Sequence, residues 1–394
     1  MSKDARQAAL ATQMIHGAPQ RDAYGSPHTP VYNTTTYRFE TTADLLDVVE
    51  GRSDGYLYTR YGHNPTIAEL EYKLAALESA GSALAFASGM AAISATLLAH
   101  GRNGVVCIGD LYGGTYSFLT EQCQSLGIPV QFLLDGELAQ LGAALNQRNM
   151  LVYCETPANP TLSILDIRQL AAIAHHNDAL LAVDNTFASP INQQPLKLGA
   201  DLVLHSATKY LGGHSDLTAG ALMAAPDLIT AVAGWRKNLG QLLSPETASL
   251  LSRSLKTLSV RVRQHNENAM AVARAVSGHP RITRTLYPGL EDFPGHALAQ
   301  QQMQGFGGMM AIEVRGGAEA AAEVADRLQL FLLAPSLGGV ESLITQPSTT
   351  SHYDLSEEAR AQRGISDGLL RLSVGLENSD DLIADLNQAL RVCR

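Results

Sequence analysis

The sequence predicts an α/β protein with a mostly parallel sheet in a large domain and a smaller α+β domain at the C-terminus. From Pro65 onward, short apolar runs alternate with amphipathic helical stretches, which is typical of parallel strands covered by helices on both faces. A long helical span, residues 245–277, then suits a bridge to a second unit. Beyond it, three strand candidates and two helical stretches fit the smaller domain.

The expected strands of the large domain are short and apolar, and they end next to polar residues. They are Ala83–Phe86, Val105–Ile108, Val130–Leu134, Leu151–Cys154, Leu180–Val183 and Leu202–Leu204. The expected helices between them include Thr66–Leu77, Met90–His100 and Ile167–Asn177. In the C-terminal domain we expect strands at Ile282–Leu286, Met309–Val314 and Leu369–Val374, with helices at Ala318–Leu328 and Asp380–Arg391.

The first 60 residues lack sustained periodicity, apart from one short helical candidate at Thr42–Glu50. They are rich in aromatic residues, in which disordered tails are poor, so we expect an arm laid across a neighbouring surface. The predicted organisation is therefore an arm over 1–60, a large domain over 61–255 and a C-terminal domain over 256–394.

The composition and charge of the chain limit the classes of function that this protein can have. The chain has 394 residues, 45% of them hydrophobic, which is enough for a large core. Its 28 basic and 38 acidic residues give a formal net charge of −10, which argues against a nucleic-acid partner or an anionic membrane surface.

The four cysteines form no Cys-x-x-Cys pair, and three of them, Cys107, Cys123 and Cys154, lie in or beside apolar runs. The N-terminus carries early charges and no apolar signal core, and the most apolar stretch, residues 84–98, is too short to span a membrane. We therefore expect a reduced, cytoplasmic protein.

Candidate site residues follow the predicted strands, because ligands of open α/β sheets bind outside the carboxyl ends of the strands. Ser206, Thr208 and Lys209 follow the sixth strand. A lysine amine can form a Schiff base with an aldehyde cofactor when its surroundings lower its pKa, and the two hydroxyls suit phosphate oxygens. Alone, a lysine after a strand is more often a solvated loop charge.

Other strand ends offer complementary groups. Ser88-Gly89-Met90 opens a helix and either binds an anion or simply caps the helix. Tyr112 could stack on a planar ring or occupy a turn, and Asn159 presents an amide from a Pro-rich loop. Asp184 is either a structural carboxylate or the partner of a protonated pyridine nitrogen.

Together these groups are the set that pyridoxal 5′-phosphate (PLP) requires. The motifs of competing chemistries are absent from the sequence: a phosphate-binding P-loop, a dinucleotide fingerprint, a His-Glu-x-x-His zinc motif and a nucleophile elbow. The adjacent His175 and His176 would point in different directions on a helix, so no metal site is expected.

At this point the sequence resembles the transsulfuration enzymes, the Cys/Met-metabolism family of PLP enzymes with the aspartate-aminotransferase-type fold (fold type I). The resemblance runs from about Ala8 to the C-terminus. It rests on specific motifs: residues 58–66 (YTRYGHNPT), 88–90 (SGM), 110–115 (DLYGGT), 155–160 (ETPANP), 183–187 (VDNTF) and 205–210 (HSATKY).

The resemblance implies a role for each matching residue. Lys209 would bind PLP and move protons, Asp184 would pair with the pyridine nitrogen, and Tyr112 would stack on the ring and assist proton transfer. The remaining implied roles are phosphate binding by Gly89, Met90, Ser206 and Thr208, contact with the phosphate of a neighbouring subunit by Tyr58 and Arg60, clamping of the substrate carboxylate by Arg371, and completion of the pocket by Asn159 and Ser336. The family also implies a homotetramer built from dimers that share active sites.

The resemblance also bears on the reaction. Many cystathionine-handling members have Glu where Pro335 stands and Arg where Ser117 stands, and methionine γ-lyases usually have Cys in place of Gly114. The arm and residues 351–356 are closer to plant-type cystathionine γ-synthases. We therefore expect γ-replacement on an activated homoserine by a thiol. The alternatives are a γ-lyase that releases 2-oxobutyrate and ammonia and, more remotely, a non-catalytic PLP-binding protein.

Overall fold

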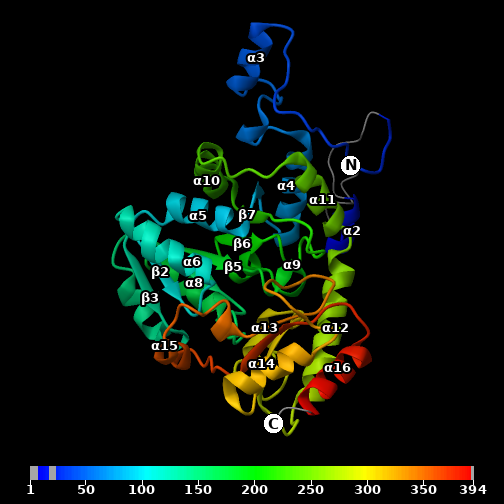
Figure 1. The fold of residues 1–394 in the computed structure, drawn as a ribbon. Coiled ribbons are helices and arrows are strands. Elements are labelled where there is room, and N and C mark those ends of the chain that lie inside the picture. Colours follow the sequence, from blue (N-terminus) through cyan, green and yellow to red (C-terminus); the bar gives the residue numbers. More distant parts are fainter. Residues whose placement is uncertain (1–7, 17–23, 392–394) are drawn as a thin grey trace.

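The computed structural model describes residues 8–16 and 24–391. It contains two sheets, one above the other in Figure 1, and an arm that projects from the end of the molecule remote from the C-terminus. The fold class predicted from the sequence is confirmed: a mostly parallel large sheet precedes a second, smaller sheet.

The large sheet has seven strands in the order β1-β7-β6-β5-β4-β2-β3. All pairs are parallel except those made by β7, which runs antiparallel to both of its neighbours. The strands are β1 (Ser82–Phe86), β2 (Val105–Ile108), β3 (Val130–Leu133), β4 (Leu151–Glu155), β5 (Leu180–Asp184), β6 (Leu202–Ser206) and β7 (Gly220–Ala224). The six predicted strands are therefore present, and β7 was not predicted.

Helices cover both faces of this sheet, as the continuous apolar strands require. One face packs against α5 (Gly89–His100) and α10 (Pro226–Asn238), and the other against α4 (Pro65–Glu78) and α8 (Ile167–His176). Smaller elements complete this part: α6 (Gly113–Ser117), η2 (Phe118–Cys123), η3 (Asp135–Gln140), α7 (Leu141–Ala144), α9 (Ser189–Asn192) and η4 (Pro195–Leu198).

The second sheet has five strands in the order β10-β11-β12-β9-β8. They are β8 (Ile282–Leu286), β9 (Met309–Val314), β10 (Leu332–Leu333), β11 (Leu343–Thr345) and β12 (Leu369–Ser373). Packed around them are α13 (His296–Gln302), α14 (Gly317–Arg327), η5 (Pro347–Thr349), α15 (Glu357–Gln362) and α16 (Ser379–Arg391). The short strands β10 and β11 were not predicted, because two or three residues give no periodic signal.

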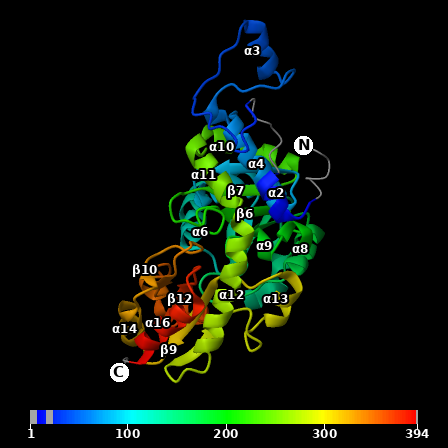
Figure 2. The ribbon, with the colours of Figure 1, turned by 90° about the vertical axis from the view of Figure 1, so that its right-hand side faces the viewer.

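The predicted single helix over residues 245–277 is wrong. Two helices replace it, α11 (Pro245–Leu255) and α12 (Leu258–Val276), separated by Lys256 and Thr257. The guanidinium of Arg261 binds the Ser254 carbonyl at 3.0 Å and the Thr257 hydroxyl at 3.1 Å, which satisfies polar groups that the break exposes. Helix α12 then runs from the large sheet down to the second sheet (Figure 2).

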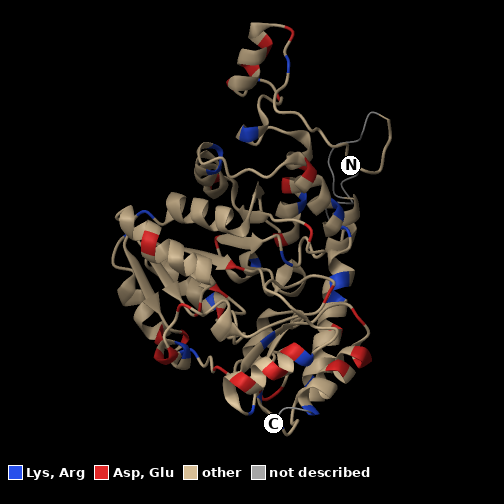
Figure 3. Ribbon diagram, viewed as in Figure 1, with Lys and Arg blue, Asp and Glu red and all other residues tan. Residues whose placement is uncertain are grey.

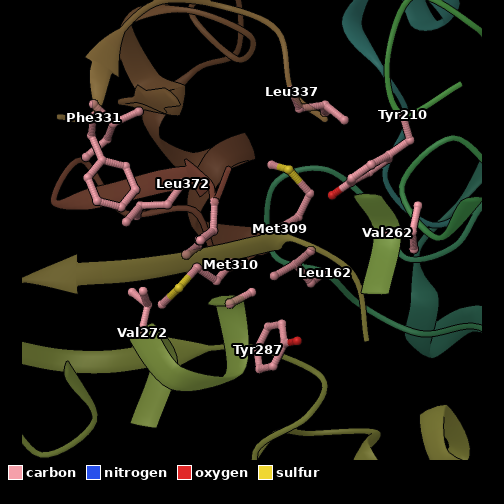
Figure 4. Packing of buried hydrophobic residues seen from close by; sticks show 14 of the residues in the cluster. Leu162, Tyr210, Val262, Val272, Tyr287, Met309, Met310, Phe331, Leu337 and Leu372 are labelled. Atoms are coloured by element: carbon pink, nitrogen blue, oxygen red, sulfur yellow. The ribbon is translucent and has the colours of Figure 1, made fainter. Parts of the chain in front are cut away.

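The two sheets share one hydrophobic core. Its buried residues include Leu70 of α4, Val262 and Val272 of α12, and Met310 and Leu372 of the second sheet. Figure 4 shows Met309, Met310 and Tyr287 packed together with residues of α12. The boundary predicted at residue 255 stays a prediction, since packing is continuous across it.

The arm contains α3 (Thr42–Val49), which matches the helical candidate, and η1 (Thr59–Tyr61). Helix α3 has no buried residue and lies far from both sheets (Figure 1). An additional helix, α2 (Leu10–His16), was not predicted, because seven residues carry little periodicity. Its buried residue, Met14, belongs to the hydrophobic cluster that also contains residues of α4. In the described part of the chain, no helix has the length and apolarity needed to cross a membrane.

Cys393 lies outside the described residues, whereas Cys107, Cys123 and Cys154 are buried and unpaired.

Candidate active site

A cavity of about 630 Å³ lies at the carboxyl ends of the parallel strands, where the second sheet faces them. The cavity brings together most of the site residues predicted from the sequence. Its lining includes Gly89, Met90, Tyr112, Asn159, Asp184, Ser206, Thr208, Lys209, Ser336 and Arg371. Residues far apart in the chain thus form one site.

Lys209 lies in the turn that follows β6. Its backbone N–H donates to the Ser206 carbonyl at 3.1 Å, and its carbonyl accepts from the Gly213 N–H at 2.7 Å. The side-chain amine donates to the Ser336 hydroxyl at 2.8 Å. Burial, reinforced by the positive charge of Arg371, lowers the pKa of Lys209 to about 8. A substantial fraction of the amine is therefore neutral, and nucleophilic, near neutral pH.

A polar cradle forms where α5 begins beside β6. The Ser88 hydroxyl caps α5 by accepting from the Ala91 N–H at 3.1 Å. Gly89 lies so close to the neighbouring strand that an added Cβ would meet the Ser206 Cβ at 2.8 Å. Thr208 is fixed by two hydrogen bonds with Ala219, whose N–H lies 3.0 Å from the threonine hydroxyl. A helix N-terminus with glycine and nearby hydroxyls suits an anion such as a phosphate.

Asp184 and Glu155 end the adjacent strands β5 and β4 and are paired in register. Asp184 accepts from the Thr186 N–H at 2.9 Å, and Glu155 accepts from the Tyr112 N–H at 2.9 Å. Burial raises the pKa of both carboxyls, and the charge of Asp184 raises that of Glu155 further. Among the described residues, neither carboxylate forms an ion pair with a lysine or arginine.

Arg371 enters the cavity from β12 of the second sheet. Its guanidinium donates to the Asn159 side-chain oxygen at 2.8 Å and to the Ser336 carbonyl at 3.0 Å, while its Nε has no partner in the structure. Burial lowers its pKa to about 10, so it remains a cation near neutral pH. Ser336 has φ 104°, a conformation that L-residues rarely adopt. The arginine contact on its carbonyl helps to hold that conformation.

Tyr112 caps the short helix α6 and is half exposed at the cavity wall. Behind it, Gly114 has no space for a side chain: an added Cβ would meet the Tyr112 ring at 2.6 Å and the Met90 sulfur at 3.2 Å. Ser117 is exposed and does not line the cavity, whereas Pro335 does.

Tyr58 and Arg60 do not reach the cavity of their own chain. Arg60 donates to the Lys237 carbonyl at 2.9 Å and lies over the rings of Tyr58 and Tyr61, 5.8 and 5.0 Å from their centroids. Both residues belong to the arm, and Arg60 attaches this part of the arm to α10 through Lys237.

Several lining residues were not predicted as site residues. They are Ile93, Glu155, Pro157, Thr186, Phe187, Thr218, Leu337, Thr345, Thr350 and Ser351. Glu155 is the most informative of them, because it opens the motif that carries Asn159. Only the pairing of β4 with β5 places it beside Asp184, and strand order cannot be read from the local sequence.

Basic and acidic residues are interspersed along the ribbon, in both the large-sheet part and the second-sheet part of the molecule (Figure 3). Among residues 8–16 and 24–391, no three His, Cys, Asp or Glu side chains are grouped as a metal ion would need.

The residues present fit PLP. Asp184 is a buried carboxyl that forms no ion pair in the described chain, which suits a protonated pyridine nitrogen. The close approach at Gly89 leaves the start of α5 open to a phosphate. Lys209 supplies an amine of lowered pKa within the same cavity.

Comparison with known proteins gives a consistent result. The sequence profile of the family described as Cys/Met metabolism PLP-dependent enzyme matches residues 11–391. The L-methionine gamma-lyase of Fusobacterium nucleatum subsp. polymorphum is 42% identical over 97% of this chain and 98% of its own length. The cystathionine gamma-synthase of Mycobacterium bovis is 44% identical over 96% of both chains.

Solved structures agree in fold. A cystathionine gamma synthase from Xanthomonas oryzae pv. oryzae, in complex with aminoacrylate and cysteine, has a TM-score of 0.89 at 40% identity, over 98% of each chain. An O-acetylhomoserine (thiol)-lyase of Campylobacter jejuni, described as putative, contains N′-pyridoxyl-lysine-5′-monophosphate. It has a TM-score of 0.93 at 32% identity, over 98% of this chain and 100% of that one.

Proposed function

Since the chain belongs to the Cys/Met metabolism family of PLP-dependent enzymes, we propose that it catalyses γ-replacement on an activated homoserine by a thiol, as a cystathionine γ-synthase does. The family supports γ-synthase or γ-lyase chemistry on an amino acid, and similar relatives carry both names. The choice between the two reactions therefore depends on this chain's own cavity.

The proposed cofactor site uses the residues at the strand ends. Gly89, Met90, Ser206 and Thr208 would hold the phosphate, and Lys209 would supply the amine that binds the cofactor covalently. Tyr112 would stack on the ring, Asp184 would pair with its nitrogen, and Asn159 would complete the pocket from the loop after β4. When bound, PLP supplies a conjugated ring that takes up the electron pair left at a deprotonated substrate carbon.

Lys209 is the proposed carrier of protons. Its pKa near 8 allows Nζ to accept a proton from the substrate α-carbon and to release it elsewhere near neutral pH. Ser336 holds the amine at 2.8 Å and so limits the positions that Nζ can adopt. Tyr112, at the cavity wall, is proposed to assist proton transfer.

Arg371 is the proposed ligand of the substrate α-carboxylate. Its contacts with Asn159 and Ser336 occupy two N–H groups, while Nε is buried without a partner. A guanidinium held in this way presents parallel N–H donors to a carboxylate. Binding the carboxylate would satisfy the unpaired Nε.

The observation that favours γ-replacement over methionine γ-elimination is the packing at Gly114. The cysteine usual in methionine γ-lyases would displace the Tyr112 ring, because even a Cβ would lie 2.6 Å from it. Tyr112 here packs directly against Gly114, so this part of the cavity wall differs from one that carries a cysteine.

A different observation favours the alternative, γ-elimination. The cavity lining described here includes Lys209 and Arg371 as its cationic side chains, and Ser117, which replaces the usual arginine, is outside it. A substrate with a second carboxylate would therefore find no further cation in this lining. Methionine, with one carboxylate, would not need one.

The arm is proposed to complete the site of a second copy. Tyr58 and Arg60 are remote from their own cavity, and α3 exposes Leu45, Leu46 and Val49. An exposed apolar helix face is stabilised by burial against a partner. We therefore propose a homotetramer of dimers in which Tyr58 assists catalysis and Arg60 binds the phosphate of the neighbouring site.

The proposal is tested by assaying purified protein with PLP. O-Acetyl-, O-succinyl- and O-phosphohomoserine are each incubated with and without cysteine, and methionine and cystathionine are incubated alone. Cystathionine formation that depends on cysteine supports γ-replacement. Its absence, with rapid 2-oxobutyrate release from methionine or cystathionine, would overturn it in favour of γ-elimination. The Lys209→Ala protein must also lose the visible absorbance that borohydride abolishes in the wild type.

A further inference from the structure

Tyr210, the residue after Lys209, is anchored in the part of the core that joins the two sheets. Its side chain is 1% exposed and belongs to the largest buried cluster. In Figure 4 its ring points toward Met309, with Leu337 and Val262 on either side. Adjacent residues of the chain thus serve different purposes: Lys209 faces the cavity and Tyr210 faces the core.

Two hydrogen bonds and one aromatic contact fix Tyr210. Its phenol accepts from the Gly308 N–H at 3.0 Å, at the start of β9. Its carbonyl accepts from the Arg261 guanidinium at 2.7 Å, and its ring meets that of His265 edge-on, with centroids 5.2 Å apart. Tyr210 is therefore bound both to the connecting helix α12 and to the second sheet.

The loop that carries Ser336 passes directly against Tyr210. A Cβ on Gly338 would lie 2.8 Å from the Tyr210 nitrogen, so the two backbones are in close contact. The Gly338 N–H in turn donates to the Ser373 hydroxyl at 2.9 Å, beside the strand that presents Arg371. Movement of Tyr210 would therefore change the position of Ser336 relative to Lys209.

Lys209 lies between two anchors. On the side of the large sheet, Thr208 is tied to Ala219 and the Ser206 N–H donates to the Thr186 hydroxyl at 2.8 Å. On the side of the second sheet, Tyr210 is the anchor. We propose that Tyr210 is a positioning residue that holds the Lys209 amine against Ser336 and links the packing of the two sheets to the reactivity of that amine.

The proposal rests on the proposed role of Lys209. Groups that face the amine across the cavity are Arg371 from β12, Asp184 from β5, Glu155 from β4 and Tyr112 from the start of α6. Those that face Tyr210 are Arg261 and His265 from α12, Arg371 from β12 and Tyr287, the residue after β8. Loosening Tyr210 would admit water to the amine and so relieve the burial that lowers the pKa of Lys209.

The test uses Tyr210→Phe, which removes only the phenolic oxygen. The matched control is Tyr287→Phe: Tyr287 is equally buried in the same cluster, and its hydroxyl donates to the carbonyl of Gly307, the residue before Gly308, at 3.0 Å. Cofactor-free proteins are mixed with PLP across a range of pH. The rate of adduct formation is followed by visible absorbance and by borohydride trapping at Lys209.

We expect the wild-type rate to reach half its maximum near pH 8. In Tyr210→Phe this midpoint should move up by about one pH unit, so that the rate at pH 7 falls about tenfold. Tyr287→Phe should keep the wild-type midpoint. An unchanged midpoint in Tyr210→Phe, or an equal shift in Tyr287→Phe, would overturn the proposal.

If Tyr210→Phe does not fold, His265→Asn takes its place, since it removes the ring that packs edge-on against Tyr210. This variant must also raise the pH at which the rate of adduct formation reaches half its maximum. An unchanged midpoint would refute the inference. Failure of the proposed function gives a different result: wild-type protein would form no trappable adduct at Lys209 at any pH.

Discussion

Glu155 and Asp184 are direct neighbours in register across β4 and β5, and both carboxyls are buried at the edge of the cavity. Two adjacent buried carboxylates repel one another, so a single cation between them stabilises only one negative charge. Glu155 has the stronger reasons to keep a proton, because both burial and the charge of Asp184 raise its pKa. We expect Asp184 to be the anion and Glu155 the neutral acid.

Substitution of the two carboxyls should therefore have unequal effects on PLP. Asp184→Asn removes the anion, and the lost charged hydrogen bond is worth about 2 kcal/mol, or roughly 30-fold in the dissociation constant of PLP. Glu155→Gln keeps an oxygen that can accept from the Tyr112 N–H, so its dissociation constant should change less than about threefold. Fluorescence titration of cofactor-free protein measures both values. Equal weakening by the two variants would show that Glu155 is also ionised.

Arg371→Lys should impair substrate binding without affecting the cofactor. A lysine cannot reproduce the parallel N–H donors of the guanidinium, and the loss of about 1.5–3 kcal/mol would raise KM by roughly 10- to 150-fold. Steady-state kinetics and PLP titration separate the two effects. Arg360→Lys is the control, since Arg360 pairs with Asp367 outside the cavity. A KM that rises equally in both variants contradicts the proposed carboxylate clamp.

His265 should make the protein less stable in acid. Burial lowers the pKa of His265 to about 4, from an ordinary value of 6.5. Between these values the unfolded chain binds the proton and the folded protein does not, so the free energy of unfolding falls as the pH decreases from 6.5 to 4. The loss is at most about 3 kcal/mol for this one group.

The comparison that isolates this effect is His265→Asn, followed by urea unfolding at several pH values. The difference in unfolding free energy between wild type and variant should shrink as the pH falls through this window. A constant difference from pH 7 to pH 4 would mean that His265 is not neutral in the folded protein. His352, whose pKa burial also lowers to about 4, is present in both proteins and cancels in the difference.

Lys73 should be a strong determinant of stability although it is remote from the cavity. It is 2% exposed, forms an ion pair with Glu69 and donates to the Ser252 hydroxyl at 2.8 Å, which joins α4 to α11. Lys73→Ala leaves a buried carboxylate unpaired and should cost about 3–5 kcal/mol in urea unfolding.

Arg38→Ala, which breaks the exposed pair with Glu40, should change stability by less than about 0.5 kcal/mol and serves as the control. Replacing Lys73 and Glu69 together by Met and Leu should restore most of the loss, because no charge then remains buried. If the double variant is as unstable as Lys73→Ala, packing rather than charge explains the effect.

The sequence was informative where a single segment carries its own signal. Each predicted strand of the large domain is a short, mostly apolar run, and the residues that follow these runs identified Lys209, Asp184 and Tyr112 as candidates for one site. Strand β7 escaped prediction because Gly220–Ala224 contains only Gly, Ala, Leu and Met, with no β-branched residue to distinguish a strand from a helix. Its strand conformation comes from pairing with β1 and β6.

What the local sequence could not reveal depends on contacts between distant segments. Glu155 meets Asp184 only through strand order, and Lys209 meets Ser336 across 127 positions of the chain. Ser336 and Arg371 became site candidates through family resemblance, since a lone serine or arginine in the second sheet carries no local signal. The break between α11 and α12 likewise depends on Arg261, which binds the carbonyl of Tyr210 after β6 and that of Ser254 near the end of α11.

At Ser336, the residue that would relieve backbone strain differs from the residue that the proposed activity requires. With φ at 104°, glycine would be the less strained residue there, so selection for thermal resistance alone would favour Ser336→Gly. That change would delete the hydroxyl that holds the Lys209 amine. Thermostabilising redesign of this protein should therefore leave residue 336 untouched, whatever a conformational score recommends.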